Sequence, residues 1–161
     1  MKKNNNTISI DALAGSLAIN NNVDERNEQI HSMLESNDKL NIEHDIVVKG
    51  IIESLRECDI FPKIGIKSIM ELKNLLHIRT PITAEVNNSH NFLDLIDILT
   101  PSASLSGYPK QKSIDKIKEL EKYDRGWYSG TIGWINNNLD CDFYAGLRSA
   151  LIKDDDLYMY G

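Results

Sequence analysis

The segment Trp127–Ile152, WYSGTIGWINNNLDCDFYAGLRSALI, contains two runs of strand-forming residues on either side of a turn. Trp127–Ile135 and Cys141–Ile152 are both rich in β-branched, aromatic and small residues, which is typical of strands. The five residues between them, Asn136–Asp140, have the composition of a turn. We therefore expect the two runs to pair as an antiparallel hairpin.

The register of this hairpin places an aromatic and a cationic side chain opposite each other. A loop that is symmetric about Asn138 pairs Ile132 with Tyr144, and the same register continued outward pairs Tyr128 with Arg148. Both side chains then lie on the same face of the sheet. A single β-bulge would instead move Tyr128 to the other face.

This pair is a candidate binding site for a carboxylate. Gly130 and Gly146 lie on the same face, so no side chain fills the space beside Tyr128 and Arg148. A carboxylate accepts two parallel hydrogen bonds from a guanidinium and a third from a phenol hydroxyl. A structural arginine that pairs with an internal acid fits the pattern equally well, so the geometry alone leaves both interpretations open.

The composition of the whole chain is that of an ordinary globular domain. Its 161 residues are 41% hydrophobic and 26% charged, which suits one domain with its own core. The net charge of -6 argues against nucleic acid as a partner, because binding to phosphates needs clustered basic residues. Cys58 and Cys141 fit neither a disulfide framework nor a zinc site, so we expect a reduced, cytoplasmic location. No run approaches the ~20 apolar residues of a membrane helix, and we expect no membrane partner.

The residues upstream of the hairpin predict strands and helices in an α+β fold, with antiparallel β-sheets flanked by helices. We expect residues 1–7, which are mostly polar, to be disordered. Ile8 and Ile10 alternate as in a strand, which runs into a turn of small residues at Ala12–Ser16, where backbone amides are accessible. The other expected elements are a helix capped by Asp24, a helix over about 41–56, extended chain over 63–86, a helix over 91–99, a loop over 100–109 and a helix over 110–122.

Two polar positions in these elements are candidates for a site. The even positions of 76–82 are mostly apolar, so His77 and Arg79 share the opposite face of a strand. A lone strand histidine is more often a satisfied structural residue than a ligand. Glu43 falls in the first turn of the expected second helix, where the helix dipole favours a carboxylate, so a purely stabilising role also fits.

Several motifs, in their order along the chain, resemble those of one enzyme family. Tyr123–Trp134 together with Leu147–Leu151 looks like the signature of the chorismate-utilising enzymes. Leu13–Ser16 resembles the LAG[ST] loop of that family, Glu43–His44 its metal-binding EH step and Leu76–Ile78 its HL strand. The family includes isochorismate synthases, salicylate synthases and the large subunits of anthranilate and aminodeoxychorismate synthases. The similar motifs extend over nearly the whole chain.

The segment Leu99–Pro109 favours one branch of this family, because it resembles the LHPTPALSGxP pattern of isochorismate synthases. Amine-transferring members carry TGAPK there, and they usually read IRT where this chain has Leu147–Ser149. The resemblance therefore implies an isochorismate synthase, which adds water at C2 of chorismate, expels the C4 hydroxyl and uses Mg²⁺ to hold the ring carboxylate. A salicylate synthase, or a component of anthranilate or aminodeoxychorismate synthase, is the alternative.

Carried over position by position, the resemblance assigns a role to six residues. Arg148 and Tyr128 would bind the enolpyruvyl carboxylate of chorismate, and Gly15 and Ser16 would offer hydrogen-bond donors near the ring carboxylate. Glu43 would be one ligand of Mg²⁺, and His77 would be a catalytic residue that lines the pocket near the enolpyruvyl group.

The family pattern also includes groups that this chain does not contain. It begins before residue 1 with a lysine that activates water and a glutamate that protonates the leaving hydroxyl, and it continues past residue 161 with a GAGIV turn and further Mg²⁺ carboxylates. Each acid–base group contributes about 10²–10⁴-fold to the rate. We therefore expect 1–161 to be a partial catalytic domain, incomplete at both ends and inactive alone. Its expected partners are chorismate and, if the enzyme is split, separately encoded flanking segments.

Overall fold

Two long strands form the centre of the molecule: β2 (Thr7–Ala18) and β5 (Leu75–Glu85) pair antiparallel along their length. The computed structural model describes residues 1–87 and 90–160. The strands that extend this central pair are β1 (Lys2–Asn4), β3 (Lys63–Ile64), β4 (Ser68–Glu71), β6 (Thr131–Ile135) and β7 (Cys141–Ala145). Together they make a seven-stranded sheet with the order β3-β5-β2-β1-β7-β6, in which β4 also pairs with β5.

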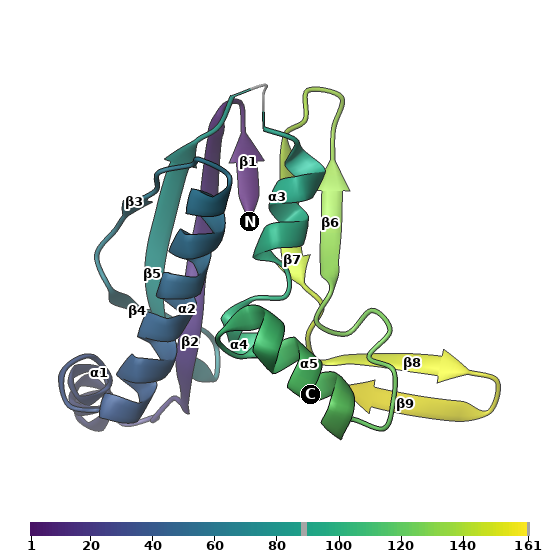
Figure 1. Cartoon of the computed structure of the whole chain (residues 1–161). Coiled ribbons are helices and arrows are strands. Elements are labelled where there is room, and N and C mark those ends of the chain that lie inside the picture. The colour runs from purple at the N-terminus through teal and green to yellow at the C-terminus, as the bar shows by residue number, and fades with distance from the viewer. Residues whose placement is uncertain (88–89, 161) are drawn as a thin grey trace.

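Helices cover one face of this sheet (Figure 1). Ile78 and Ile82 of β5 point toward the helices and are buried, whereas His77 and Arg79 lie on the other face, half-buried. The predicted common face of His77 and Arg79 and the predicted α+β class are therefore confirmed. The helices in the described part of the chain are α1 (Val23–Glu35), α2 (Asp38–Glu57), α3 (Phe92–Leu99), α4 (Ala103–Ser106) and α5 (Lys110–Leu120).

The hydrophobic core lies between α2 and the central strands. Val47, Ile51 and Leu55 recur on one side of α2 and pack against Ile8 and Ile82 of the sheet. This spacing is that of an amphipathic helix with one apolar stripe. No helix among residues 1–87 and 90–160 is long and apolar enough to cross a membrane.

The first two helices begin earlier than expected. The N-cap of α1 is Asn22, whose side chain accepts from the amide of Asp24 at 2.9 Å, so Asp24 lies in the first turn and is not the cap. The N-cap of α2 is Asn37. Because α2 starts at Asp38, Glu43 lies in its second turn, and the prediction that Glu43 occupies the first turn is wrong.

The N-terminal segment is ordered where we expected disorder in residues 1–7. Lys2–Asn4 forms β1, which pairs with β2 on one side and with β7 on the other. The amino group of Met1 donates to the carbonyl oxygen of Phe143 at 2.6 Å, and Lys3 Nζ donates to the carbonyl of Leu139 at 3.0 Å. The pairing joins residues that are more than 130 positions apart in the sequence, so the polar composition of the segment contained no signal for it.

The hairpin of the initial prediction forms in its inner half only. Its predicted register is confirmed at Ile132 and Tyr144, and the amide of Gly146 donates to the carbonyl of Gly130 at 2.8 Å. Beyond this point the chain departs from the predicted strand. A second, two-stranded sheet follows, made of β8 (Ser149–Lys153) and β9 (Asp156–Tyr160). Figure 1 shows this sheet projecting away from the large one.

Candidate functional site

The small-residue stretch of β2 continues the strand and contains a bulge, where a turn was expected. The register of β2 against β5 shifts at Gly15, so that Ser16 pairs with His77. Gly15 has a φ of 73°, a conformation that side chains disfavour. A Cβ at Gly15 would lie 3.1 Å from Cδ1 of Ile78 and 3.2 Å from Cβ of Leu40, so the bulge is closely packed on the helix side.

The bulge brings Ser16 into contact with His77. Ser16 Oγ and His77 Nδ1 are 2.6 Å apart, on the sheet face opposite the helices. Burial lowers the pKa of His77 below its ordinary value, and the positive charge of Arg148 lowers it further. His77 is therefore neutral near pH 7, and Arg148 lies close enough to influence its charge. The structure thus brings together Gly15, Ser16 and His77, with the charge of Arg148 close enough to act on His77.

The strand pairing that was predicted to place Tyr128 opposite Arg148 does not form. The ladder of β6 and β7 ends at Thr131 and Ala145, and positive φ angles at Ser129 (64°) and Arg148 (46°) mark where the two arms turn out of register. Arg148 lies close enough to His77 to lower its pKa, and the ring of Tyr128 stacks on that of Tyr160.

Tyr128 belongs to a separate aromatic cluster. Its ring stacks on that of Tyr160, with centroids 5.3 Å apart, and the guanidinium of Arg125 lies 5.5 Å from the centre of the Tyr128 ring. Arg125 in turn donates to the carboxylate of Glu121 at 2.7 Å. These residues line a cavity of about 670 Å³ between the segment that follows α5 and the β8–β9 hairpin.

Glu43 does not belong to a metal site in the described structure. Its side chain is exposed on α2, and among residues 1–87 and 90–160 no three His, Cys, Asp or Glu side chains are grouped to hold a metal ion. Mg²⁺ needs six oxygen ligands in a near-octahedral arrangement, several of which are usually water. The residues present therefore do not make a magnesium site by themselves.

His44, a buried residue next to the bulge, was not predicted as a site residue. It is fully buried, and its Nε2 lies 2.8 Å from Oγ1 of Thr80, which is buried in β5. Burial lowers the pKa of His44, and the charge of Lys67 acts in the same direction. The signal was present in the sequence, because His44 shares the helical spacing of the buried residues Leu40 and Val47.

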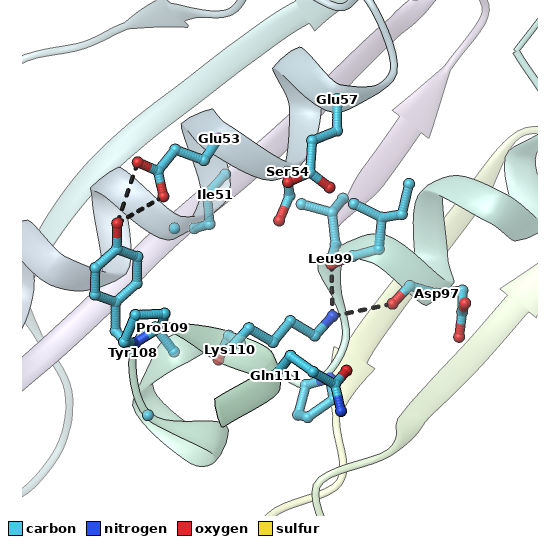
Figure 2. A pocket seen from close by; sticks show the side chains of 16 residues that line it. Ile51, Glu53, Ser54, Glu57, Asp97, Leu99, Tyr108, Pro109, Lys110 and Gln111 are labelled. Carbon is cyan, nitrogen blue, oxygen red and sulfur yellow. Dashed lines mark hydrogen bonds between the residues drawn. The ribbon is translucent and has the colours of Figure 1, made fainter. Parts of the chain in front are cut away.

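A second cavity, of about 440 Å³, lies between α2 and the helices α3 to α5 (Figure 2). Figure 2 shows Tyr108 reaching Glu53, to which its hydroxyl donates at 2.9 Å. The ammonium of Lys110 donates to the carbonyl oxygens of Asp97, Ile98 and Thr100 at 3.2, 2.7 and 2.9 Å. These polar groups bind one another, and none of the predicted site residues lines the cavity.

The comparisons with known proteins agree on one family. The chain matches the family model described as "Chorismate binding enzyme" over residues 1–161. It is 35% identical over 156 residues to the isochorismate synthase MenF of Bacillus subtilis, covering 95% of this chain and 32% of the relative. It is 31% identical over 150 residues to the salicylate biosynthesis isochorismate synthase of Pseudomonas aeruginosa, covering 92% of this chain and 31% of the relative. The chain thus spans about a third of the length of these relatives.

A solved structure shares the fold. The menaquinone-specific isochorismate synthase MenF from Escherichia coli superposes with a TM-score of 0.81 at 25% identity, over 92% of this chain and 34% of that one. The sequence motifs, the fold and the matched family agree, and the chain therefore belongs to the chorismate binding enzyme family.

Proposed function

We propose that this chain is the chorismate-binding part of a Mg²⁺-dependent isochorismate synthase. The reaction adds water at C2 of chorismate and expels the C4 hydroxyl, which leaves as water after protonation, so the composition of the substrate is unchanged. The proposal is supported by the relatives from B. subtilis and P. aeruginosa, whose names describe isochorismate synthases. It is also supported by the LTPSASLSGYP segment at Leu99–Pro109.

The observation that carries the proposal is the group formed by the Gly15 bulge, Ser16, His77 and Arg148. Arg148 is a fixed cation, and a guanidinium binds a carboxylate through two parallel bonds. Gly15 permits the positive φ of the bulge that pairs Ser16 with His77. If Ser16 donates to Nδ1 of His77, the hydrogen of the neutral ring is on Nε2, which then faces a ligand as a donor.

We propose that turnover requires groups outside the 161 residues. The general acid and base that the family resemblance implies lie outside the matched third, and Glu43 supplies one carboxylate where Mg²⁺ needs further oxygens. In this proposal Glu43 is one Mg²⁺ ligand, the other carboxylates come from the remainder of the domain, and the isolated chain binds chorismate without converting it.

Two measurements on the purified chain test the proposal. Calorimetric titration with chorismate should detect binding, and Arg148→Met should weaken that binding about 10-fold or more, since the variant loses a charge-assisted pair worth about 1.5–3 kcal/mol. Arg56→Met removes an exposed arginine at the end of α2 and is the matched control. Absence of chorismate binding, or an equal effect of the two variants, would contradict the assigned site.

The second measurement is turnover, followed by chromatography after incubation with chorismate and Mg²⁺. Robust formation of isochorismate by the chain alone would contradict the proposed need for further segments. Salicylate in the chromatogram would instead support the alternative activity within the family. Neither outcome depends on the binding measurement, so substrate recognition and catalytic competence are tested separately.

A further inference from the structure

The C-terminal part of the chain contributes almost nothing to the hydrophobic core. Among the described residues, Cys141 is the only hydrophobic residue that is buried after Leu95. Large apolar side chains there face solvent instead, with Trp127 at 90%, Ile152 at 77% and Met159 at 80% exposed. Exposure of so many large apolar side chains in one stretch of sequence is unusual for the surface of a monomeric soluble protein.

The β8–β9 hairpin has one face that is apolar throughout. In its register Ala150 pairs with Met159 and Ile152 with Leu157, and these four side chains point to the same side, which we call the apolar hairpin face. The opposite face carries Tyr160, which stacks on Tyr128. One face of the hairpin is therefore partnered within the chain, and the apolar hairpin face is exposed to solvent.

A second exposed apolar surface lies on β6 and β7. Phe143 packs toward the helices against Phe92, with ring centroids 5.7 Å apart. Ile132, Trp134 and Tyr144 point to the other side and are 59%, 55% and 66% exposed. β6 is also the last strand of its sheet, so its outer edge has backbone groups without a strand partner in the described structure.

An isolated two-stranded hairpin is marginally stable in water, and it becomes stable when an apolar face packs against further structure. The same holds for the outer face of β6, by which we mean the exposed side that carries Ile132 and Trp134. The size of the relatives indicates what that structure is. The E. coli enzyme superposes on 92% of this chain, yet the match covers 34% of that enzyme, so most of that polypeptide lies outside the matched part.

We propose that the apolar hairpin face and the outer face of β6 are the docking surface for a polypeptide that carries the remainder of a chorismate-binding domain. This inference rests on the proposed function, because it takes the partner to be the part that completes the enzyme. The partner supplies an apolar surface over Ile152 and Met159 and a strand beside the free edge of β6. Burial of the exposed apolar side chains is the driving force for assembly.

The test uses the part of the B. subtilis isochorismate synthase that lies outside the 156 matched residues, co-expressed with this chain. We expect the polypeptides to co-purify and the backbone amides of β8 and β9 to exchange hydrogen more slowly in the complex than in the chain alone. The double variant Ile152→Ser, Met159→Ser should bind at least 10-fold more weakly, which corresponds to about 1.4 kcal/mol.

The matched control is Phe61→Ser, Ile66→Ser, which removes two side chains that are 77% and 87% exposed around β3. This control should bind the partner as tightly as the unchanged chain does. All four substituted side chains are exposed, so the backbone amides of β2 and β5 should exchange hydrogen at the same rate in every variant. Three results would overturn the inference: no complex, equal affinity of the hairpin variant and the unchanged chain, or a homodimer that protects the hairpin instead.

Failure of this inference is distinguishable from failure of the proposed function. A complex that forms through the hairpin but neither binds nor converts chorismate would contradict the proposed function alone. A chain that binds chorismate through Arg148 but forms no complex would contradict the docking surface alone.

Discussion

Replacing Gly15 with alanine tests how closely the bulge of β2 is packed. The φ of 73° at Gly15 costs an L-residue about 1–2 kcal/mol. The added Cβ would also lie 3.1 Å from Cδ1 of Ile78 and 3.2 Å from both Cβ and the carbonyl oxygen of Leu40. Crowding inside a packed core adds about 1–3 kcal/mol. We therefore expect Gly15→Ala to lower the free energy of unfolding by about 2–5 kcal/mol.

Gly50→Ala is the matched control, because it makes the same chemical change in the same core with the opposite expected sign. Gly50 lies inside α2, and its added Cβ would meet the Cβ of Ala103 at 3.5 Å, an ordinary contact. Alanine is favoured over glycine inside a helix by about 0.5–1 kcal/mol, so this variant should be slightly more stable.

Urea denaturation followed by circular dichroism measures both changes, and chorismate titration shows whether the bulge matters for binding. A Gly15→Ala protein as stable as the unchanged chain would refute the described packing. So would a loss of the same size in both variants, since the argument depends on the contacts and the φ at Gly15 and not on the loss of a glycine.

Three further predictions concern single contacts. Arg148→Met should raise the pKa of His77 toward its ordinary value, because a nearby positive charge disfavours protonation; an NMR titration of the histidine rings that shows no change would place Arg148 elsewhere. Lys110→Met keeps the aliphatic stem but removes the bonds to three carbonyl oxygens, and should lower the free energy of unfolding by about 1–3 kcal/mol in urea denaturation; a neutral result would mean that water replaces the ammonium. A double-mutant cycle of His44→Ala and Thr80→Val should give a coupling energy of about 0.5–1.5 kcal/mol, and strict additivity would exclude the 2.8 Å bond.

The features that local sequence patterns predicted are those that depend on side-chain periodicity. The alternation along 76–82 placed His77 and Arg79 on one face of β5, and the turn at 136–140 set the pairing of Ile132 with Tyr144. In both cases neighbouring residues determine which face is buried, so a single sequence contains the information. The stretch Ala12–Ser16 was predicted as a turn, and in the structure it is a bulge within β2.

The features that the sequence did not predict depend on distant contacts or on backbone angles with no residue preference. Strand β1 forms because Met1 and Lys3 reach Phe143 and Leu139 across the sheet. The outer half of the hairpin breaks at Ser129 and Arg148, which adopt positive φ angles although neither is a glycine or an asparagine. No local signal distinguishes these residues from the same residue types in a continuous strand.

The break in the hairpin changes the neighbours of Arg148 in the candidate carboxylate site. In the predicted hairpin Arg148 faced Tyr128, and in the structure it lies near His77 and the Gly15 bulge. A carboxylate held by Arg148 would therefore approach the imidazole of His77, whose Nε2 offers a hydrogen bond without a second positive charge when Ser16 donates to Nδ1. Tyr128, stacked on Tyr160, lies instead on the partnered side of the hairpin whose other face we propose to be a docking surface. In these proposals substrate binding is assigned to Arg148 and the Gly15 bulge, and assembly to β6 and to the β8–β9 hairpin, which begins directly after Arg148.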